Sequence, residues 1–226
     1  MRIPPATDVR DYVRHLGVRR TLLRGAYVLA NQVVALSIFD CVRLRPEDLV
    51  ADVATESGGA FHGRFANPSE LGRLANDLDG VGQRVLGEAL ERGDSCYVVF
   101  DGARLANISF YADRPVAILN DLMVHFQAPW WYMHGAFTPT AYRGRRLHAV
   151  GILGAARELF GRGVSGFVGV YERTNYRSMV SALRMGWRPC GTLYRLRVGS
   201  WMRLGHSADA RAVGMRLEPR VAEDRT

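Results

Sequence analysis

The stretch that decides the fold runs from Trp130 to Trp187, and its first part reads WWYMHGAFTPTAYRGRRLHAV over residues 130–150. The apolar and aromatic residues 130–137 predict a strand, which Thr138-Pro139-Thr140 ends. The residues that follow predict a helix, because apolar side chains recur every three or four positions and form one stripe. These side chains are Ala149, Ile152, Leu153, Ala156 and Phe160.

The turn between this strand and this helix is rich in arginine. Arg143, Arg145 and Arg146 surround Gly144 immediately before the helix begins. The first backbone N–H groups of a helix have no partner within it, and they carry the positive end of the helix dipole. Together with the guanidinium groups, they predict a binding site for an anion such as a pyrophosphate.

Over about sixty residues the chain resembles the GNAT N-acetyltransferase superfamily. In that family an Arg/Gln-x-x-Gly-x-Gly/Ala turn after a strand holds the pyrophosphate of acetyl-CoA. Arg143 takes the first position of the motif, while Arg146 and His148 stand where the family has its glycine and its small residue. A predicted strand at residues 164–171 follows at the family's spacing, and so do Asn175 and the triplet Met185-Gly186-Trp187.

The resemblance implies a mixed α/β (α+β) fold with a mostly antiparallel central sheet and helices on both faces. It implies an N-acyltransferase, most simply an N-acetyltransferase, that moves the acyl group directly from acetyl-CoA or another acyl-CoA in a ternary complex. The acceptor would be an amine of a small molecule or an amino acid. A backbone N–H near Ala136 to Thr138 would meet the thioester carbonyl. The implied CoA-binding residues are Ala136, Phe137, Thr138, Arg143, Gly144, Arg145, Arg146, Leu147, His148, Asn175 and Ser178.

The general base has no carboxylate candidate on the strand at 130–137, although many family members carry one there. Tyr132 and His134 lie on one face of that strand if it is regular, because side chains alternate. The ordinary pKa of histidine, about 6.5, suits proton acceptance at neutral pH. We therefore predict that His134 is the base, with Tyr132 as a second catalytic candidate. A histidine packed between elements of the fold is the competing interpretation.

The other candidates come from positions near the motif. The family's tyrosine, seven residues after the asparagine, falls on Ala182, so Tyr176 is a substitute candidate for the acid. Asn120 and Asp121 are candidates for acceptor binding, because we expect them on a strand that neighbours residues 130–137.

The rest of the chain predicts one domain with an arm before it and a tail after it. We expect a basic helical arm at 1–30, a GNAT-like domain at 31–204 and a loose tail at 205–226. The further predicted elements are a strand at 33–44, a loop at 51–65, helices from 68 and from 81, a hairpin at 95–111 turning at Asp101-Gly102, and strands at 116–126, 191–198 and 201–204.

Charge and composition bear on partners. All 30 basic residues are arginine, as in proteins from GC-rich genomes, and the net charge is +8. This charge predicts attraction to anions. Val18 to Arg24 could dock an acidic acyl carrier protein, or be an ordinary amphipathic arm. Two alternatives to the acyl-CoA enzyme stay open: a carrier-protein donor, and a non-catalytic CoA-binding protein of GNAT fold.

Several other classes are disfavoured by the sequence. Cys41, Cys96 and Cys190 are far apart, and the histidines form no HExxH or close pair, so we expect no metal site. Nucleic-acid binding is disfavoured because no basic run is interleaved with aromatic residues. No signal peptide or membrane-spanning run is visible, and we expect a cytoplasmic protein. A homodimer is among the assemblies that the sequence allows.

Overall fold

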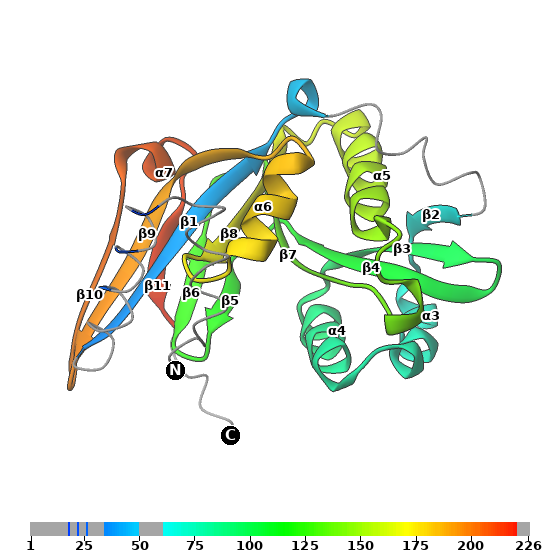
Figure 1. Cartoon of the computed structure of the whole chain (residues 1–226), viewed down its shortest axis with the longest axis horizontal. Helices are drawn as coiled ribbons and strands as arrows, with labels where there is room; N and C mark the ends of the chain where they lie inside the picture. The colour runs from blue at the N-terminus through cyan, green and yellow to red at the C-terminus, as the bar shows by residue number, and fades with distance from the viewer. Residues whose placement is uncertain (1–17, 19–21, 23–25, 27–33, 50–60, 221–226) are drawn as a thin grey trace.

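The computed structural model describes residues 18, 22, 26, 34–49 and 61–220 (Figure 1). In this part of the chain an eight-stranded sheet has the order β10-β9-β1-β8-β7-β4-β3-β2, and a three-stranded sheet has the order β11-β6-β5. The strands are β1 Ala35–Leu44, β2 Phe61–Phe65, β3 Ser95–Asp101, β4 Arg104–Ala112, β5 Val116–Leu119, β6 Leu122–His125, β7 Trp130–Phe137, β8 Gly166–Glu172, β9 Arg188–Val198, β10 Trp201–His206 and β11 Arg216–Pro219. The helices are η1 Pro46–Asp48, α3 Pro68–Leu74, η3 Ala75–Asp77, α4 Gly80–Arg92, η4 Thr140–Tyr142, α5 Leu147–Gly161, α6 Tyr176–Arg184 and α7 Ala208–Ala212.

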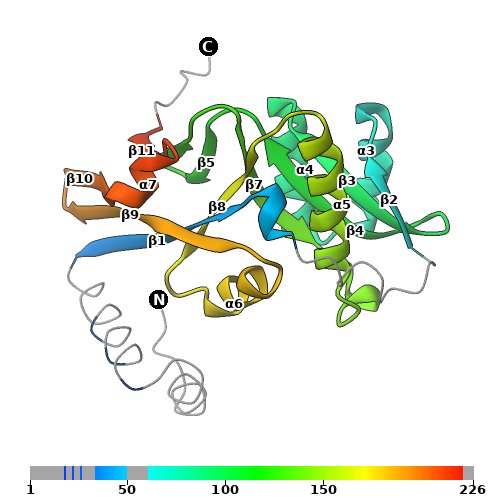
Figure 2. The same cartoon turned by 90° about the horizontal axis from the view of Figure 1, so that it is seen from above.

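Helices cover both faces of the large sheet, as the resemblance implies. Buried residues of α5 and α6 share one core with Val99, Met133 and Phe167 of the sheet. On the other face, α3 and α4 bury Leu71 and Leu86 against β3 and β4. Figure 2 shows α6 on one side of β9, β1 and β8, and α7 with the small sheet on the other. The predicted fold class is therefore confirmed.

The central strands β7 and β8 are parallel, whereas all other paired strands in the described residues are antiparallel. Their ladder contains only three pairs, from Trp130 with Gly166 to Tyr132 with Val168. Beyond Tyr132, β7 continues beside β4 and β8 continues beside β1. The large sheet thus opens at its centre after the first residues of these two strands.

Helix α5, which follows β7, lies very close to the sheet because two of its sheet-facing residues, Gly151 and Gly154, are glycines. A Cβ atom at Gly151 would stand 2.4 Å from Asn107 Oδ1, and one at Gly154 would stand 2.3 Å from the Tyr97 hydroxyl. Larger side chains would push the helix away from β3 and β4. The close fit fixes where α5 begins relative to the end of β7.

Most predicted elements are confirmed, with boundaries shifted by a few residues. The helix after Asn67-Pro68 has its capping box, in which the Asn67 N–H donates to Glu70 Oε1 at 3.0 Å. Asp79 caps α4, and Gly93 ends it with a left-handed φ of 73°. The hairpin at Asp101-Gly102 and the pairing of β9 with β10 are also present. The arm at Val18 to Arg24 lies almost wholly outside the described residues.

Two expectations about strands are wrong. Residues 61–65 form β2 and not a loop. Among the described strands β2 pairs with β3 alone, at the edge of the sheet, so its exposed centre lacks an apolar pattern. The expected strand at 116–126 is a hairpin of β5 and β6 that turns at Asn120-Asp121 and belongs to the small sheet. Asparagine and aspartate favour turns because their side chains hydrogen-bond to nearby backbone.

The expectation of a loose tail is also wrong for Ser207 to Pro219. Ser207 caps α7, and β11 pairs with β6. Ala210, Val213, Met215 and Leu217 are buried in the core between the two sheets. Their spacing of three, two and two positions combines a short helix with a strand, so no single period runs through them in the sequence, but together they cover the small sheet.

We expect Met215→Ala to lower the free energy of unfolding by about 2 to 5 kcal/mol, the usual cost of truncating a buried methionine. Met215 has 0% of its surface exposed. Urea titration of the full chain measures the change, with the exposed Arg211→Ala as the matched control. Equal stability of the two variants would show that the tail does not contribute to the core.

Candidate active site

The site begins at a β-bulge in β7. In the pairing with β4, Phe110 stands opposite Gly135 and Tyr111 opposite Met133, so His134 is the extra residue. The sequence placed the exposed backbone donor near Ala136 to Thr138, but the irregularity lies earlier, at Met133 to Gly135. A bulge leaves backbone groups out of the ladder and turns side chains. It falls just where the ladder between β7 and β8 has ended.

The arginine turn continues from the end of β7. Gly144 has a φ of 82°, and Arg146 has a φ of 56°, so two residues of the turn are left-handed. Arg146, the N-cap residue of α5, does not cap the helix with its own side chain. The Arg143 Nε donates to the Thr138 carbonyl at 3.3 Å, and the Arg145 guanidinium lies 5.6 Å from the centre of the Tyr142 ring. The uncapped helix start therefore faces solvent among exposed guanidinium groups.

His148, the second residue of α5, adds no positive charge to the start of the helix. Burial lowers the pKa of His148 below its ordinary value, so its imidazole is neutral at neutral pH. His148 stands where the family has a small residue, but its half-buried side chain is directed partly into the protein. The structure thus brings residues 143–148 together around one helix terminus.

A cavity of about 400 Å³ lies beside the turn, lined by residues of β7 and of the segment that precedes α4. Four predicted CoA-binding residues, Ala136, Phe137, Thr138 and Arg143, contribute to its wall. The remaining lining residues are Asp77, Leu78, Asp79, Pro139 and Thr140. Nearby, Asn107 fastens the end of β7, because its Nδ2 donates to the Phe137 carbonyl at 3.0 Å and to Thr138 Oγ1 at 2.9 Å.

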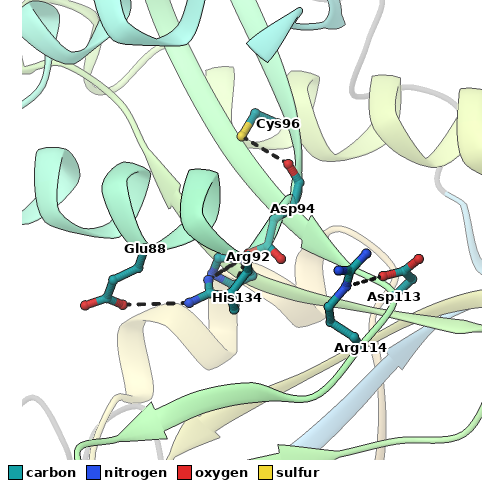
Figure 3. A network of polar contacts seen from close by, with 7 residues as sticks. All are labelled: Glu88, Arg92, Asp94, Cys96, Asp113, Arg114 and His134. Carbon is teal, nitrogen blue, oxygen red and sulfur yellow. Dashed lines mark hydrogen bonds and ion pairs between the residues drawn. The ribbon is translucent and has the colours of Figure 1, made fainter. Parts of the chain in front are cut away.

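His134 lies in a network of charged side chains that the sequence did not predict (Figure 3). Its Nε2 is 2.8 Å from Asp94 Oδ2 and 3.5 Å from Arg92 Nη2. Arg92 also donates to Asp94 Oδ2, at 2.7 Å from Nη2. The imidazole stacks on the Phe110 ring and lies beside the Tyr132 ring, so Tyr132 and His134 do share one face.

The electrostatics of this network favour a charged Asp94. Burial alone would raise the pKa of Asp94, but hydrogen bonds from His134 and Arg92 outweigh it and hold the pKa below its ordinary value. The side chains of Asp94 and His134 are 0% and 7% exposed. Sequence reasoning missed both residues, because Arg92 ends α4 and Asp94 follows it without any motif, 42 and 40 residues before His134.

The other candidates fall in different surroundings. Tyr132 is buried in the core between the two sheets, and burial raises its pKa far above neutrality, which fits a packing role. Asn175 caps α6, because its Oδ1 accepts from the Ser178 N–H at 3.4 Å. Tyr176 follows it as the first residue of α6. The structure thus joins Asn175 to Ser178, but no hydrogen bond or ion pair joins either of them to the arginine turn within the described residues.

The acceptor candidates Asn120 and Asp121 are not beside β7. They form the turn between β5 and β6, and Asp121 is paired with Arg195 at 2.7 Å and Arg197 at 3.5 Å on β9. The neighbours of β7 are β4 and β8. The expectation failed because residues 116–126 are two strands and not one.

Two further findings hold for the described residues only. These residues contain no helix long and apolar enough to cross a membrane. They also contain no group of three or more histidine, cysteine, aspartate or glutamate side chains placed to hold a metal ion. The three cysteines, Cys41, Cys96 and Cys190, are free and buried.

Comparisons with known proteins found similarity in structure but not in sequence. No protein-family model matches the sequence, and no curated protein matches it. Among solved structures, a GCN5-related glucosamine N-acetyltransferase region of a fungal multi-domain β-N-acetylglucosaminidase is 15% identical, with a TM-score of 0.54 over 83% of this chain and 23% of that one. A GNAT-family acetyltransferase from Colwellia psychrerythraea is 10% identical, with a TM-score of 0.48 over 76% and 59%.

A GCN5-related N-acetyltransferase from Kribbella flavida is 15% identical, with a TM-score of 0.46 over 79% of this chain and 66% of that one. In each of the three comparisons the chain spans less than two thirds of the other protein's length. At these identities the likeness concerns the fold. The chain has the GNAT fold, and the resemblance drawn from residues 130–187 is confirmed at that level.

We expect the free energy of unfolding to be about 1 kcal/mol higher for Arg146→Gly than for Arg146→Ala, because both variants lose the arginine side chain and only glycine adopts the left-handed conformation without a steric cost. Arg146 is the only non-glycine residue with a positive φ in the described part of the chain. Arg145 has no positive φ and is the control: there Arg145→Gly should be less stable than Arg145→Ala by about 0.5 to 1 kcal/mol, because glycine adds freedom to the unfolded chain. Denaturant titrations compare the four variants, and the same order at both positions would contradict the strained conformation.

Proposed function

We propose that the protein is an acyl-CoA-dependent N-acyltransferase. The observation that carries the proposal is the three-pair ladder between β7 and β8, which ends beside the bulge at His134. Beyond the ladder, the β8-facing backbone edge of β7 has no strand partner in the described residues, and it leads to the arginine turn. An extended, amide-containing ligand with an anionic end matches such an edge, because strand backbone binds amides and helix starts bind phosphate.

The residues of the turn fit the pyrophosphate of CoA. Arg143, Arg145 and the first N–H groups of α5 would hold its phosphates. The cavity lined by Ala136, Phe137, Thr138 and Arg143 would accommodate part of the arm that joins the pyrophosphate to the sulfur. Bound acyl-CoA supplies a thioester, which is the activated acyl group of the reaction.

Acyl transfer to an amine also needs a proton acceptor, since a protonated amine has no lone pair with which to attack. We propose that His134 takes this proton, because it is the titratable side chain at the bulge. A backbone N–H at Met133 to Gly135 would donate to the carbonyl oxygen, the role of an oxyanion-stabilising donor. Acceptor and acyl-CoA would be bound together, so that transfer is direct.

The proposed acceptor class is a primary amine of a small molecule. The fungal region with the same fold is described as a glucosamine N-acetyltransferase, so glucosamine is a suitable first probe. Free thiol released from acetyl-CoA in the presence of glucosamine, aminoglycosides, polyamines or amino acids reports turnover. A reaction that produces thiol only with an amine present would support transfer over simple hydrolysis.

Binding of CoA at the turn gives the first test. We expect Arg143→Ala and Arg145→Ala each to weaken binding by about 1 to 3 kcal/mol, the scale of a lost charge-assisted hydrogen bond. Isothermal titration calorimetry at low salt measures the affinity, with Arg162→Ala at the other end of α5 as the control. If the wild type does not bind CoA, the acyltransferase proposal fails.

The pH dependence of turnover gives the second test. His134→Gln should lower the rate by about 100- to 10,000-fold and leave CoA affinity nearly unchanged, because it removes a base and not a phosphate contact. The wild-type rate should fall as the pH falls and the imidazole takes up a proton, and the variant should lose this acidic limb. His125→Gln is the control, since His125 pairs with Glu218 in the small sheet. An unchanged rate and limb in His134→Gln would assign His134 to packing.

A further inference from the structure

We infer that Asp94 is the positioning residue of the site: it fixes the ring of His134 and directs the basic lone pair to Nδ1, while Arg92 holds Asp94 in place. The inference rests on the proposed function, because it assigns a role to His134 in the transfer. It goes beyond that proposal by supplying, from a different part of the chain, the carboxylate that β7 lacks.

The tautomer of His134 follows from the chemistry of its partner. A carboxylate only accepts hydrogen bonds, so the contact of 2.8 Å between His134 Nε2 and Asp94 Oδ2 requires a proton on Nε2. In neutral imidazole the other nitrogen then carries the lone pair. Nδ1 has no hydrogen-bond partner among the described residues. Because Nδ1 is the ring nitrogen nearer the backbone, this lone pair lies close to the bulge.

The buried position of the Asp94 carboxylate lowers the stability of the fold. Its side chain is 0% exposed, and Oδ1 is buried without a hydrogen-bond partner in the described part of the chain. Among the described residues, Arg92 and His134 are its hydrogen-bond donors, and both of them bind Oδ2. A buried carboxylate with one unsatisfied oxygen costs stability, and such groups are found where function requires them. This arrangement therefore favours a functional role over a purely structural one.

The charges around His134 act on it in opposite directions. Asp94 favours the imidazolium, whereas the Arg92 guanidinium, 3.5 Å from Nε2, disfavours it. Glu88 lies 4.0 Å from Arg92 on the exposed side of α4. The remaining titratable neighbours are neutral, because burial raises the pKa of Cys96 to about 12 and that of Tyr132 still further. Figure 3 shows Arg92 reaching from the end of α4 between Glu88 and Asp94.

The experiment follows His134 directly and needs no acceptor. Nitrogen-15 NMR of the histidine rings in the full chain, with His134 assigned from the spectrum of His134→Gln, reports both tautomer and protonation. We expect a proton on Nε2 in the neutral form. Asp94→Asn should move the midpoint of the titration to lower pH by about 1 unit or more, and Arg92→Gln should move it to higher pH.

Turnover of acetyl-CoA with glucosamine, or with whichever amine in the panel releases thiol, gives the second readout. Asp94→Asn should lower kcat by about 100-fold or more, with KM for acetyl-CoA changed less than threefold, because the tautomer and not the phosphate site is disturbed. The acidic limb should move in the same direction as the NMR midpoint. Glu218→Gln, which breaks the pair of His125 with Glu218, is the control and should leave both readouts unchanged.

The outcomes separate the inference from the proposed function. A wild type that neither binds CoA nor releases thiol overturns the proposed function, whatever the NMR shows. An active wild type with its proton on Nδ1, or with midpoints that do not move in opposite directions in the two variants, overturns the role of Asp94. If Asp94→Asn does not fold, Arg92→Gln and the wild-type tautomer decide the question by themselves.

Discussion

The structure depends on one feature: β7 and β8, the two parallel strands at the centre of the sheet, pair over only three residues. Up to Tyr132 and Val168 the large sheet is continuous, and beyond them β7 stays with β4 while β8 stays with β1. Buried residues of both halves share cores with the covering helices and the small sheet, so the backbone edges separate while the core beneath them stays continuous. Under the proposed function, this opening would accommodate a ligand that lies along β7.

The close packing of α5 makes the opening useful. Gly151 and Gly154 allow the helix to lie directly on β3 and β4, which fixes its uncapped first turn at the end of β7. Asn107 holds that end of the strand through Phe137 and Thr138. Strand β7 therefore leads from the bulge toward the arginine turn at the start of α5, so that one extended ligand could contact both places. Under the proposed function, His134 at the bulge would add proton transfer to this path.

The sequence predicted what depends on local pattern. The strand at 130–137, the arginine turn, the helix after it and the hairpin at Asp101-Gly102 all have periodicity or turn residues of their own. What it could not predict depends on contacts between distant residues. Asp94 meets His134 across 40 positions, and β2 and β11 are recognisable as strands only through their partners β3 and β6. The pair Asn120-Asp121 was misassigned because apolar residues on both sides concealed a turn.

The central claim is that the opening beside β7 and the start of α5 together hold acyl-CoA. Hydrogen–deuterium exchange of the full chain with and without CoA tests it most directly, because it reports on backbone amides at both places in one experiment. We predict slower exchange at residues 133–138 and 145–148, with no change in the hairpin of β5 and β6. Protection confined to other segments, or none at saturating CoA, would contradict the claim.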